Sequence, residues 1–163
     1  MHFRGQFDVG ASRDRVWAFV TDPQKVGRCG PDVQRVEVVD PTHFKVVARV
    51  GIGPIRSTFA LDVEFTETRP AEHAAVHTRG QAPGSAVEMT STLDLADAAA
   101  GRTTLRWTSD VTVSGKIASI GARLMQHAAD KITQQVFACM KYRCAPCQRR
   151  CRRARPLPAR ARA

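Results

Sequence analysis

The sequence predicts an α+β domain in which a curved antiparallel sheet wraps onto one long C-terminal helix, with two short helices after the first strand. Two observations support this prediction. Apolar and polar residues alternate in a series of segments between residues 2 and 113, which is typical of half-buried strands. After Ser114-Gly115 the apolar period becomes 3.6. A long amphipathic helix must bury its apolar stripe, and the sheet is the only partner of comparable size.

Local signals predict the N-terminal elements. Residues 2–9 alternate cleanly and should form the first strand. Ser12 is a suitable N-cap for a short helix whose apolar face lies within residues 16–20. Asp22-Pro23 should end this helix or start a second one, because the residue before a proline disfavours helical geometry.

Six more strands should follow, each bounded by turns rich in Gly, Pro or Asp. They are expected at residues 33–39, 44–50, 59–65, 74–78, 87–95 and 105–113. Asp62 and Glu64 alternate with the apolar residues of their strand, so we expect them on a solvated outer face. The helix should extend to about Tyr142 and bury a stripe made of Ile117, Ile120, Gly121, Leu124, Ala128, Ile132 and Val136.

The space between sheet and helix is the candidate site. Periodicity leaves open whether this space is a cavity or a closely packed core. A cavity lined by large apolar residues and a few hydroxyls would suit a hydrophobic molecule with a polar head group. The residues that strand and helix periodicity place on its wall are Phe44, Phe59, Leu61, Thr78, Met89, Ser91, Leu93, Trp107, Ser109, Leu124 and Ala128.

The positive charge is concentrated at the C-terminus. The net charge is +10, but nine of the 25 Lys and Arg residues lie in residues 141–163, where no acidic residue occurs. We therefore predict a ligand-binding domain over residues 1–143 and a disordered basic tail over residues 144–163. Tyr142 is the only aromatic residue near this tail that could stack on a base. Contact with an anionic membrane therefore fits the tail at least as well as nucleic acid does.

Four of the five cysteines, Cys139, Cys144, Cys147 and Cys151, are crowded at the C-terminal end, and only Cys29 lies elsewhere. This distribution is not typical of a disulfide framework. The spacing matches one pattern of iron–sulfur ligation, but no second pair completes a zinc site. We expect reduced thiols and no metal. Neither a secretory signal nor an apolar run long enough to span a bilayer is present, which favours a cytoplasmic protein.

Catalytic motifs are not evident. The five histidines are scattered, and the sequence pairs none of them with a carboxylate. It also contains no nucleophile elbow, phosphate-binding loop or dinucleotide fingerprint. We therefore predict no catalytic residue. His77 would reach the cavity only if its strand were out of register with this interpretation.

Four stretches occur in order: HFRGQFDVGASRDRVWAFVTDPQKVGRCGP, FKVVARVGIGPIRSTFALDVEF, GSAVEMTSTLDL and WTSDVTVSGKIASIGARLMQHAADKITQQVF. Together they resemble the carbon monoxide dehydrogenase G-subunit family of the START/Bet v 1-like (SRPBCC) superfamily, over roughly residues 1 to 142. The resemblance implies a helix-grip fold with a cavity for lipids or other hydrophobic molecules between the sheet and the long helix.

For function, the resemblance implies a non-enzymatic accessory protein of a molybdenum-containing carbon monoxide dehydrogenase or related hydroxylase. Such a protein would link the enzyme to the inner face of the membrane and bind a quinone, menaquinone or ubiquinone, without a covalent cofactor. The alternative is a cyclase or dehydratase that uses the same pocket. Two departures from the family pattern occur. Cys29-Gly30-Pro31-Asp32 replaces cysteine-leucine-proline-glycine, and arginines stand where many relatives continue into an apolar anchor. The expected membrane contact is therefore electrostatic.

Overall fold

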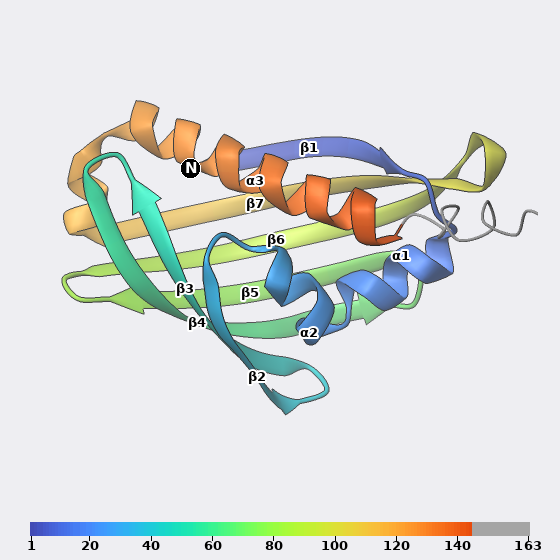
Figure 1. Cartoon of the computed structure of the whole chain (residues 1–163), viewed down its shortest axis with the longest axis horizontal. Helices are drawn as coiled ribbons and strands as arrows, with labels where there is room; N and C mark the ends of the chain where they lie inside the picture. Colours follow the sequence, from blue (N-terminus) through green and yellow to red (C-terminus); the bar gives the residue numbers. More distant parts are fainter. Residues whose placement is uncertain (145–163) are drawn as a thin grey trace, which may run out of the picture.

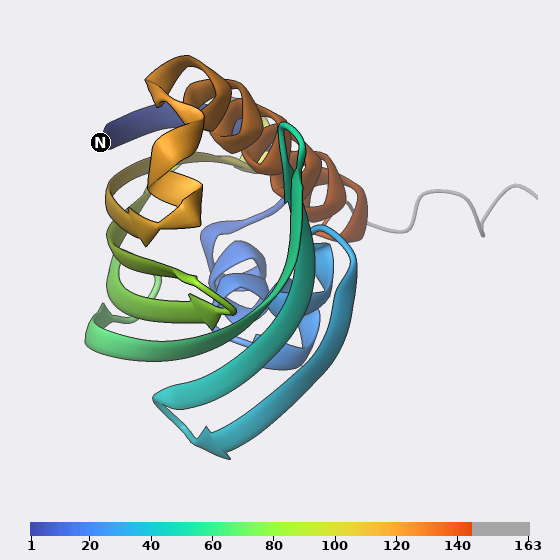
Figure 2. The same ribbon diagram turned by 90° about the vertical axis from the view of Figure 1, so that its left-hand side faces the viewer.

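The structure is a computed structural model that describes residues 1–144. It confirms the predicted architecture: seven antiparallel strands form one curved sheet in the order β1-β7-β6-β5-β4-β3-β2, and the long helix α3 crosses its concave side (Figure 1). Figure 2 shows the sheet curling around the space that α3 covers. Within residues 1–144, no helix is long and apolar enough to cross a bilayer.

All seven expected strands are present, and most are longer than predicted. The strands are β1 (His2–Val9), β2 (Val33–Asp40), β3 (His43–Ile52), β4 (Ile55–Arg69), β5 (His73–Ala82), β6 (Ser85–Ala98) and β7 (Arg102–Gly115). The helices are α1 (Arg13–Val20), α2 (Pro23–Val26) and α3 (Ala122–Cys144), with short 3₁₀ segments η1 (Gly27–Cys29), η2 (Ala99–Gly101) and η3 (Lys116–Ile120).

Short turns join β2 through β7 into consecutive antiparallel pairs, and β1 pairs with β7 at the far edge. Gly80 on β5 helps the sheet to curve. A Cβ atom at this position would lie 2.5 Å from Val87 Cγ1 and 2.6 Å from Leu61 Cδ2. Because glycine has no side chain, the inward side chains of the two neighbouring strands approach each other over Gly80, as a concave sheet requires.

The segment between β1 and β2 covers one end of the concave side. The Ser12 side chain caps α1 by accepting a hydrogen bond from the Arg15 amide, as predicted. Asp22 caps α2 in the same way, and Pro23 occupies the first turn of that helix. Val16 and Phe19 of α1 are buried in a cluster formed with β6, β7 and the end of α3. The capped helices therefore pack as a lid over this end of the sheet.

The long helix begins later than the sequence predicted. The predicted stripe started at Ile117, but residues 116–120 form the 3₁₀ segment η3, and Gly121 has a φ of 92°, which interrupts the helical path. From Ala122 the helix is regular. Leu124 was expected on the buried stripe, but its side chain is 42% exposed and its neighbour Met125 is buried instead.

The expectation of reduced thiols is wrong for Cys29 and Cys139, because a disulfide joins them across a sequence separation of 110 residues. The lid brings η1 against the last third of α3, and this approach leaves no signal in the cysteine spacing. Cys144, which the sequence assigned to the tail, is the buried last residue of α3. Cys147 and Cys151, like the rest of the predicted basic tail, lie outside the described residues.

Candidate functional site: an apolar cavity under the long helix

A cavity of about 520 Å³ lies between the concave side of the sheet and α3. This volume falls within the range of roughly 300–1,000 Å³ that small-molecule sites occupy. The alternative of a fully packed core, which periodicity left open, does not hold here. The sheet contributes most of the wall, and Val20 of α1 and Val26 of α2 close it from the lid.

Helix α3 presents one continuous face to the cavity. Each residue on this face except the last is followed by one that lies three or four positions further along the chain, as expected for one face of an α-helix. The residues of this face are Met125, Ala128, Ala129, Ile132, Thr133, Val136, Phe137 and Met140. The predicted stripe advanced mainly in steps of four, and each such step rotates by about 40° beyond a full turn. That drift explains why Leu124, the first member of the predicted stripe that lies within α3, is outside the cavity.

Two serines form the main polar contact on the sheet side. Ser91 of β6 lies directly opposite Ser109 of β7 in the antiparallel register, and their hydroxyl oxygens are 2.9 Å apart. One hydroxyl donates to the other, so the accepting hydroxyl keeps its own hydrogen free for another acceptor. The pair therefore offers a neutral donor in a wall that is mostly apolar.

Trp107 lies on the same face of β7, two residues before Ser109. Its ring is 5.7 Å from the ring of Phe137 on α3. Its indole nitrogen lies over Gly5 of β1, where an added Cβ would come within 2.8 Å of Nε1. Among residues 1–144, Trp107 Nε1 is the one buried side-chain nitrogen or oxygen with no hydrogen-bond partner. Most buried polar groups in native proteins are paired, so this donor needs an explanation.

None of the described residues on the cavity wall has an ionisable side chain. A charged ligand group would therefore lose its hydration without gaining a charged side chain as counter-ion, which is strongly unfavourable. The ammonium of the wall residue Met1 already donates to the Val111 carbonyl. The wall suits uncharged molecules.

Clusters of packed side chains flank the space at both ends. At one end Ile52, Phe59 and Ile117 form a buried cluster that fills the gap between sheet and helix. At the other end the lid packs against α3, where the Cys29–Cys139 disulfide adjoins the wall residue Met140. Residues of both clusters, such as Met125 and Met140, also line the hollow, which therefore extends along most of α3.

The structure places seven of the eleven predicted ligand-binding residues on the cavity wall. These are Phe44, Met89, Ser91, Leu93, Trp107, Ser109 and Ala128. Phe59, Leu61, Thr78 and Leu124 do not line it. Phe59 belongs to the cluster that flanks one end, with Leu61 packed against it. Thr78 is buried within the sheet. Ligand binding by the seven remains a prediction.

Several wall residues were missing from the sequence prediction. Counting in steps of three as well as four along α3 would have found Met125, Phe137 and Met140. Phe3 of β1 also follows from the alternation of its strand, once β1 is known to close the sheet. Val26 has no such signal, because only the packing of the lid brings it to the cavity.

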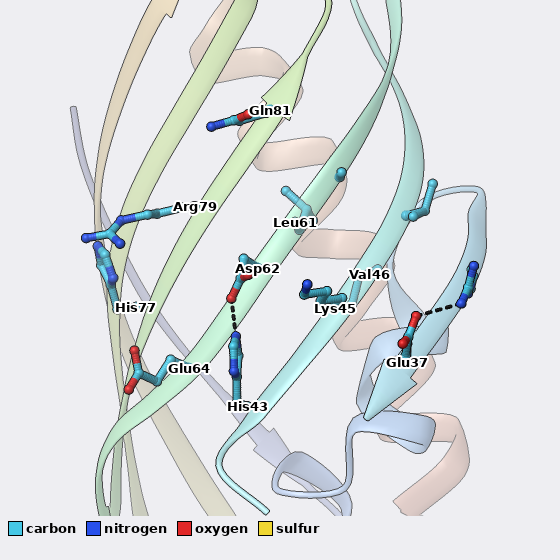
Figure 3. Close-up of a pocket in the computed structure, with 13 residues that line it drawn as sticks. Glu37, His43, Lys45, Val46, Leu61, Asp62, Glu64, His77, Arg79 and Gln81 are labelled. Carbon is cyan, nitrogen blue, oxygen red and sulfur yellow. Dashed lines mark hydrogen bonds and ion pairs between the residues drawn. The ribbon is translucent and has the colours of Figure 1, made fainter. Parts of the chain in front are cut away.

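The opposite face of the sheet carries a polar hollow of about 560 Å³ (Figure 3). Asp62 and Glu64 lie here, on the outer face where the sequence placed them, and Asp62 pairs with His43. His77 also lies on this face and not in the cavity, with Nε2 2.9 Å from a Glu88 carboxylate oxygen. His77 first and then Arg79 lower the pKa of Glu88 below its ordinary value.

Four histidines have carboxylate partners on neighbouring strands, which corrects the sequence prediction that they had none. The pairs are His2–Asp110, His43–Asp62, His73–Asp94 and His77–Glu88. Antiparallel pairing brings these residues together although they are far apart in sequence. Exposed ion pairs of this kind contribute little to stability. In residues 1–144, no cluster of three His, Cys, Asp or Glu side chains could hold a metal ion.

Solved structures resemble the chain in fold. A conserved protein from Geobacillus kaustophilus matches with a TM-score of 0.83 and 21% identity, covering 88% of this chain and 94% of that one. The Zhui aromatase/cyclase from Streptomyces sp. R1128 matches with a TM-score of 0.66 and 17% identity, covering 88% and 93%. A START superfamily protein from Mycobacterium smegmatis matches with a TM-score of 0.64 and 13% identity, covering 88% and 96%.

A search of curated protein sequences found no match. The family model for the carbon monoxide dehydrogenase G-subunit (CoxG) matches residues 5–145, which includes every strand and helix described above except the first residues of β1. The sequence resemblance and the helix-grip architecture agree with this match. The chain therefore belongs to the carbon monoxide dehydrogenase G-subunit (CoxG) family.

Proposed function

We propose that this protein is a non-enzymatic binding protein for an uncharged hydrophobic molecule, a quinone such as menaquinone or ubiquinone. The single observation that carries the proposal is the 520 Å³ cavity, whose wall is apolar apart from a few hydroxyls and one indole. A quinone has a flat apolar ring, an apolar tail and two neutral carbonyl oxygens. These groups match an apolar wall that has neutral donors and no ionisable side chain.

We propose further that the protein serves a molybdenum-containing carbon monoxide dehydrogenase or a related hydroxylase. The family name supports this partner. A quinone carrier would accept electrons from such an enzyme and pass them toward the membrane. Peripheral contact with anionic lipids through the basic residues beyond 144 would place it at the inner face of the membrane. In that reducing compartment the disulfide would need protection, and Cys29 is only 2% exposed.

Native mass spectrometry of protein purified from its own membranes tests the ligand. We expect a bound molecule that dissociates on organic extraction and has the mass of an isoprenoid quinone. An empty protein that also fails to bind added quinones would refute the proposal. Removal of residues 145–163 tests the membrane contact separately, because the cavity lies wholly within residues 1–144. Ligand binding should survive this truncation, whereas binding to anionic vesicles should fall and lose its salt dependence.

An enzymatic role is the second candidate, because one structural relative is named an aromatase/cyclase. Acid–base catalysis would need a titratable side chain facing the ligand. The described wall carries none, and the predicted candidate His77 lies on the outer face. Mass analysis distinguishes the two roles, since a carrier returns its extracted ligand unchanged, while an enzyme converts it during incubation.

A further inference from the structure

Trp107 has an indole N–H that no group of the described chain satisfies. The ring packs against Gly5 on one side and lies near Phe137 of α3. A buried donor without a hydrogen-bond partner lowers the stability of the fold, because its lost hydration is not replaced. A phenylalanine would fill a similar space without this cost, so packing alone does not explain why a tryptophan is present.

The unpaired donor lies beside a second neutral donor. Trp107 and Ser109 are on the same inward face of β7, and the Ser91–Ser109 hydroxyl pair leaves one hydroxyl hydrogen free. All three residues line the cavity. Two hydrogen-bond donors therefore lie within one part of the wall, and the remaining side chains of the described wall are apolar apart from Thr92, Thr108 and Thr133.

We propose that Trp107 and the Ser91–Ser109 pair form the head-group site of the cavity and select ligands with an uncharged carbonyl oxygen over hydrocarbons and over carboxylates. This inference rests on the proposed function, since it assigns the ligand's polar end within the same cavity. In the structure the indole nitrogen lies over Gly5, so donation to the ligand requires the indole to turn its N–H from Gly5 toward the cavity.

Selection against carboxylates follows from the same wall. A fatty acid would bring a negative charge beside the neutral donors of this site, and no Lys, Arg or His on the described wall would balance it. The ammonium of the wall residue Met1 already donates to the Val111 carbonyl. Hydroxyl and indole donors hydrogen-bond a neutral carbonyl at little desolvation cost, whereas an unpaired buried carboxylate is strongly disfavoured. The site therefore separates quinones, ketones and esters from free fatty acids.

Equilibrium dialysis of the full chain with three probes tests this site. The probes are a naphthoquinone methylated at both ring positions open to thiols, the dimethylnaphthalene of the same shape, and decanoate. Methylation prevents covalent addition of cysteine thiols to the quinone. The variants are Trp107→Phe and Ser109→Ala, with Met89→Leu as a control on the apolar wall.

We expect Trp107→Phe to weaken quinone binding about tenfold through the loss of one neutral hydrogen bond, while hydrocarbon binding changes by less than about twofold. Ser109→Ala should also weaken quinone binding more than hydrocarbon binding. This variant replaces Trp107→Phe in the test if Trp107→Phe does not fold. Met89→Leu should affect both aromatic probes equally. Decanoate should bind the unaltered protein more weakly than the quinone does.

Three outcomes would overturn the proposal, and each contradicts a different part of it. If both serine and tryptophan variants weaken quinone and hydrocarbon equally, or neither changes anything, the head-group site is wrong but the hydrophobic cavity remains. If decanoate binds as tightly as the quinone, the neutral selectivity is wrong. If the unaltered protein binds none of the probes, the proposed function itself fails.

Discussion

The Cys29–Cys139 disulfide should contribute a large part of the stability of this domain, because it closes a long loop. It connects η1 in the lid to α3, with a sequence separation of 110 between the two cysteines. In the chain-entropy model, closing a loop of this length lowers the conformational entropy of the unfolded chain and so destabilises the unfolded state by about 4.8 kcal/mol. The stabilisation that disulfides provide is typically about 2–4 kcal/mol. We therefore expect reduction to lower the free energy of unfolding by about 2–4 kcal/mol.

Urea unfolding with and without dithiothreitol measures this contribution. With an m-value of about 2 kcal/mol/M, the unfolding midpoint should fall by about 1–2 M on reduction. Cys29→Ala, Cys139→Ala and the double variant should all unfold near the midpoint of the reduced protein, and dithiothreitol should not shift them further. The two single effects should therefore not add, because each removes the same bond.

Cys144→Ala provides the matched control. Cys144 is also buried near the end of α3, but it forms no disulfide with a described residue, and burial raises the pKa of its thiol. Relative to the unaltered protein in the same buffer, this variant should lose the same free energy of unfolding in oxidising and in reducing conditions, since only side-chain packing changes. Equal midpoints for the oxidised and reduced unaltered protein, or additive effects of the two single variants, would refute the reasoning.

Three further substitutions test the cavity, the tryptophan and the outer face. Ala128→Phe should fill the hollow and reduce quinone binding more than about tenfold with little change in melting temperature; undiminished binding would contradict the site. Gly5→Ala should destabilise by about 1–3 kcal/mol, because its Cβ meets Trp107 Nε1, and an unchanged midpoint would disprove that contact. His77→Gln should raise the pKa of Glu88 toward its ordinary value in an NMR titration, and an unaltered pKa would exclude the pair.

The pH dependence of the Glu88 interaction has a definite sign. His77 and then Arg79 lower the pKa of Glu88 in the folded protein, so the folded state binds fewer protons at this site than the unfolded state does. The resulting stability is present above the unfolded pKa and is lost as the pH falls through the lowered folded pKa. Because Glu88 lies on the exposed face, we expect the effect on stability to be small.

Local patterns in the sequence are sufficient to predict the strands, their inward faces and the fold class. Alternation is a local property, so the seven strands can be located one by one, and their hairpin pairing follows from the short turns between them. The same alternation places Ser91, Trp107 and Ser109 on the inward face, where the structure has them. It also places Asp62 and Glu64 on the outer face.

Long-range packing sets where α3 starts, which of its residues face the sheet, and what closes the cavity. Gly121 interrupts the helical path and so sets where α3 starts, and the orientation of α3 on the sheet puts Met125 on the wall and Leu124 outside it. The disulfide depends on the lid folding back over the sheet, and the unpaired Trp107 N–H depends on β1 pairing with β7. Such contacts join residues far apart in the chain, and their physical cause is tertiary packing, which periodicity does not record.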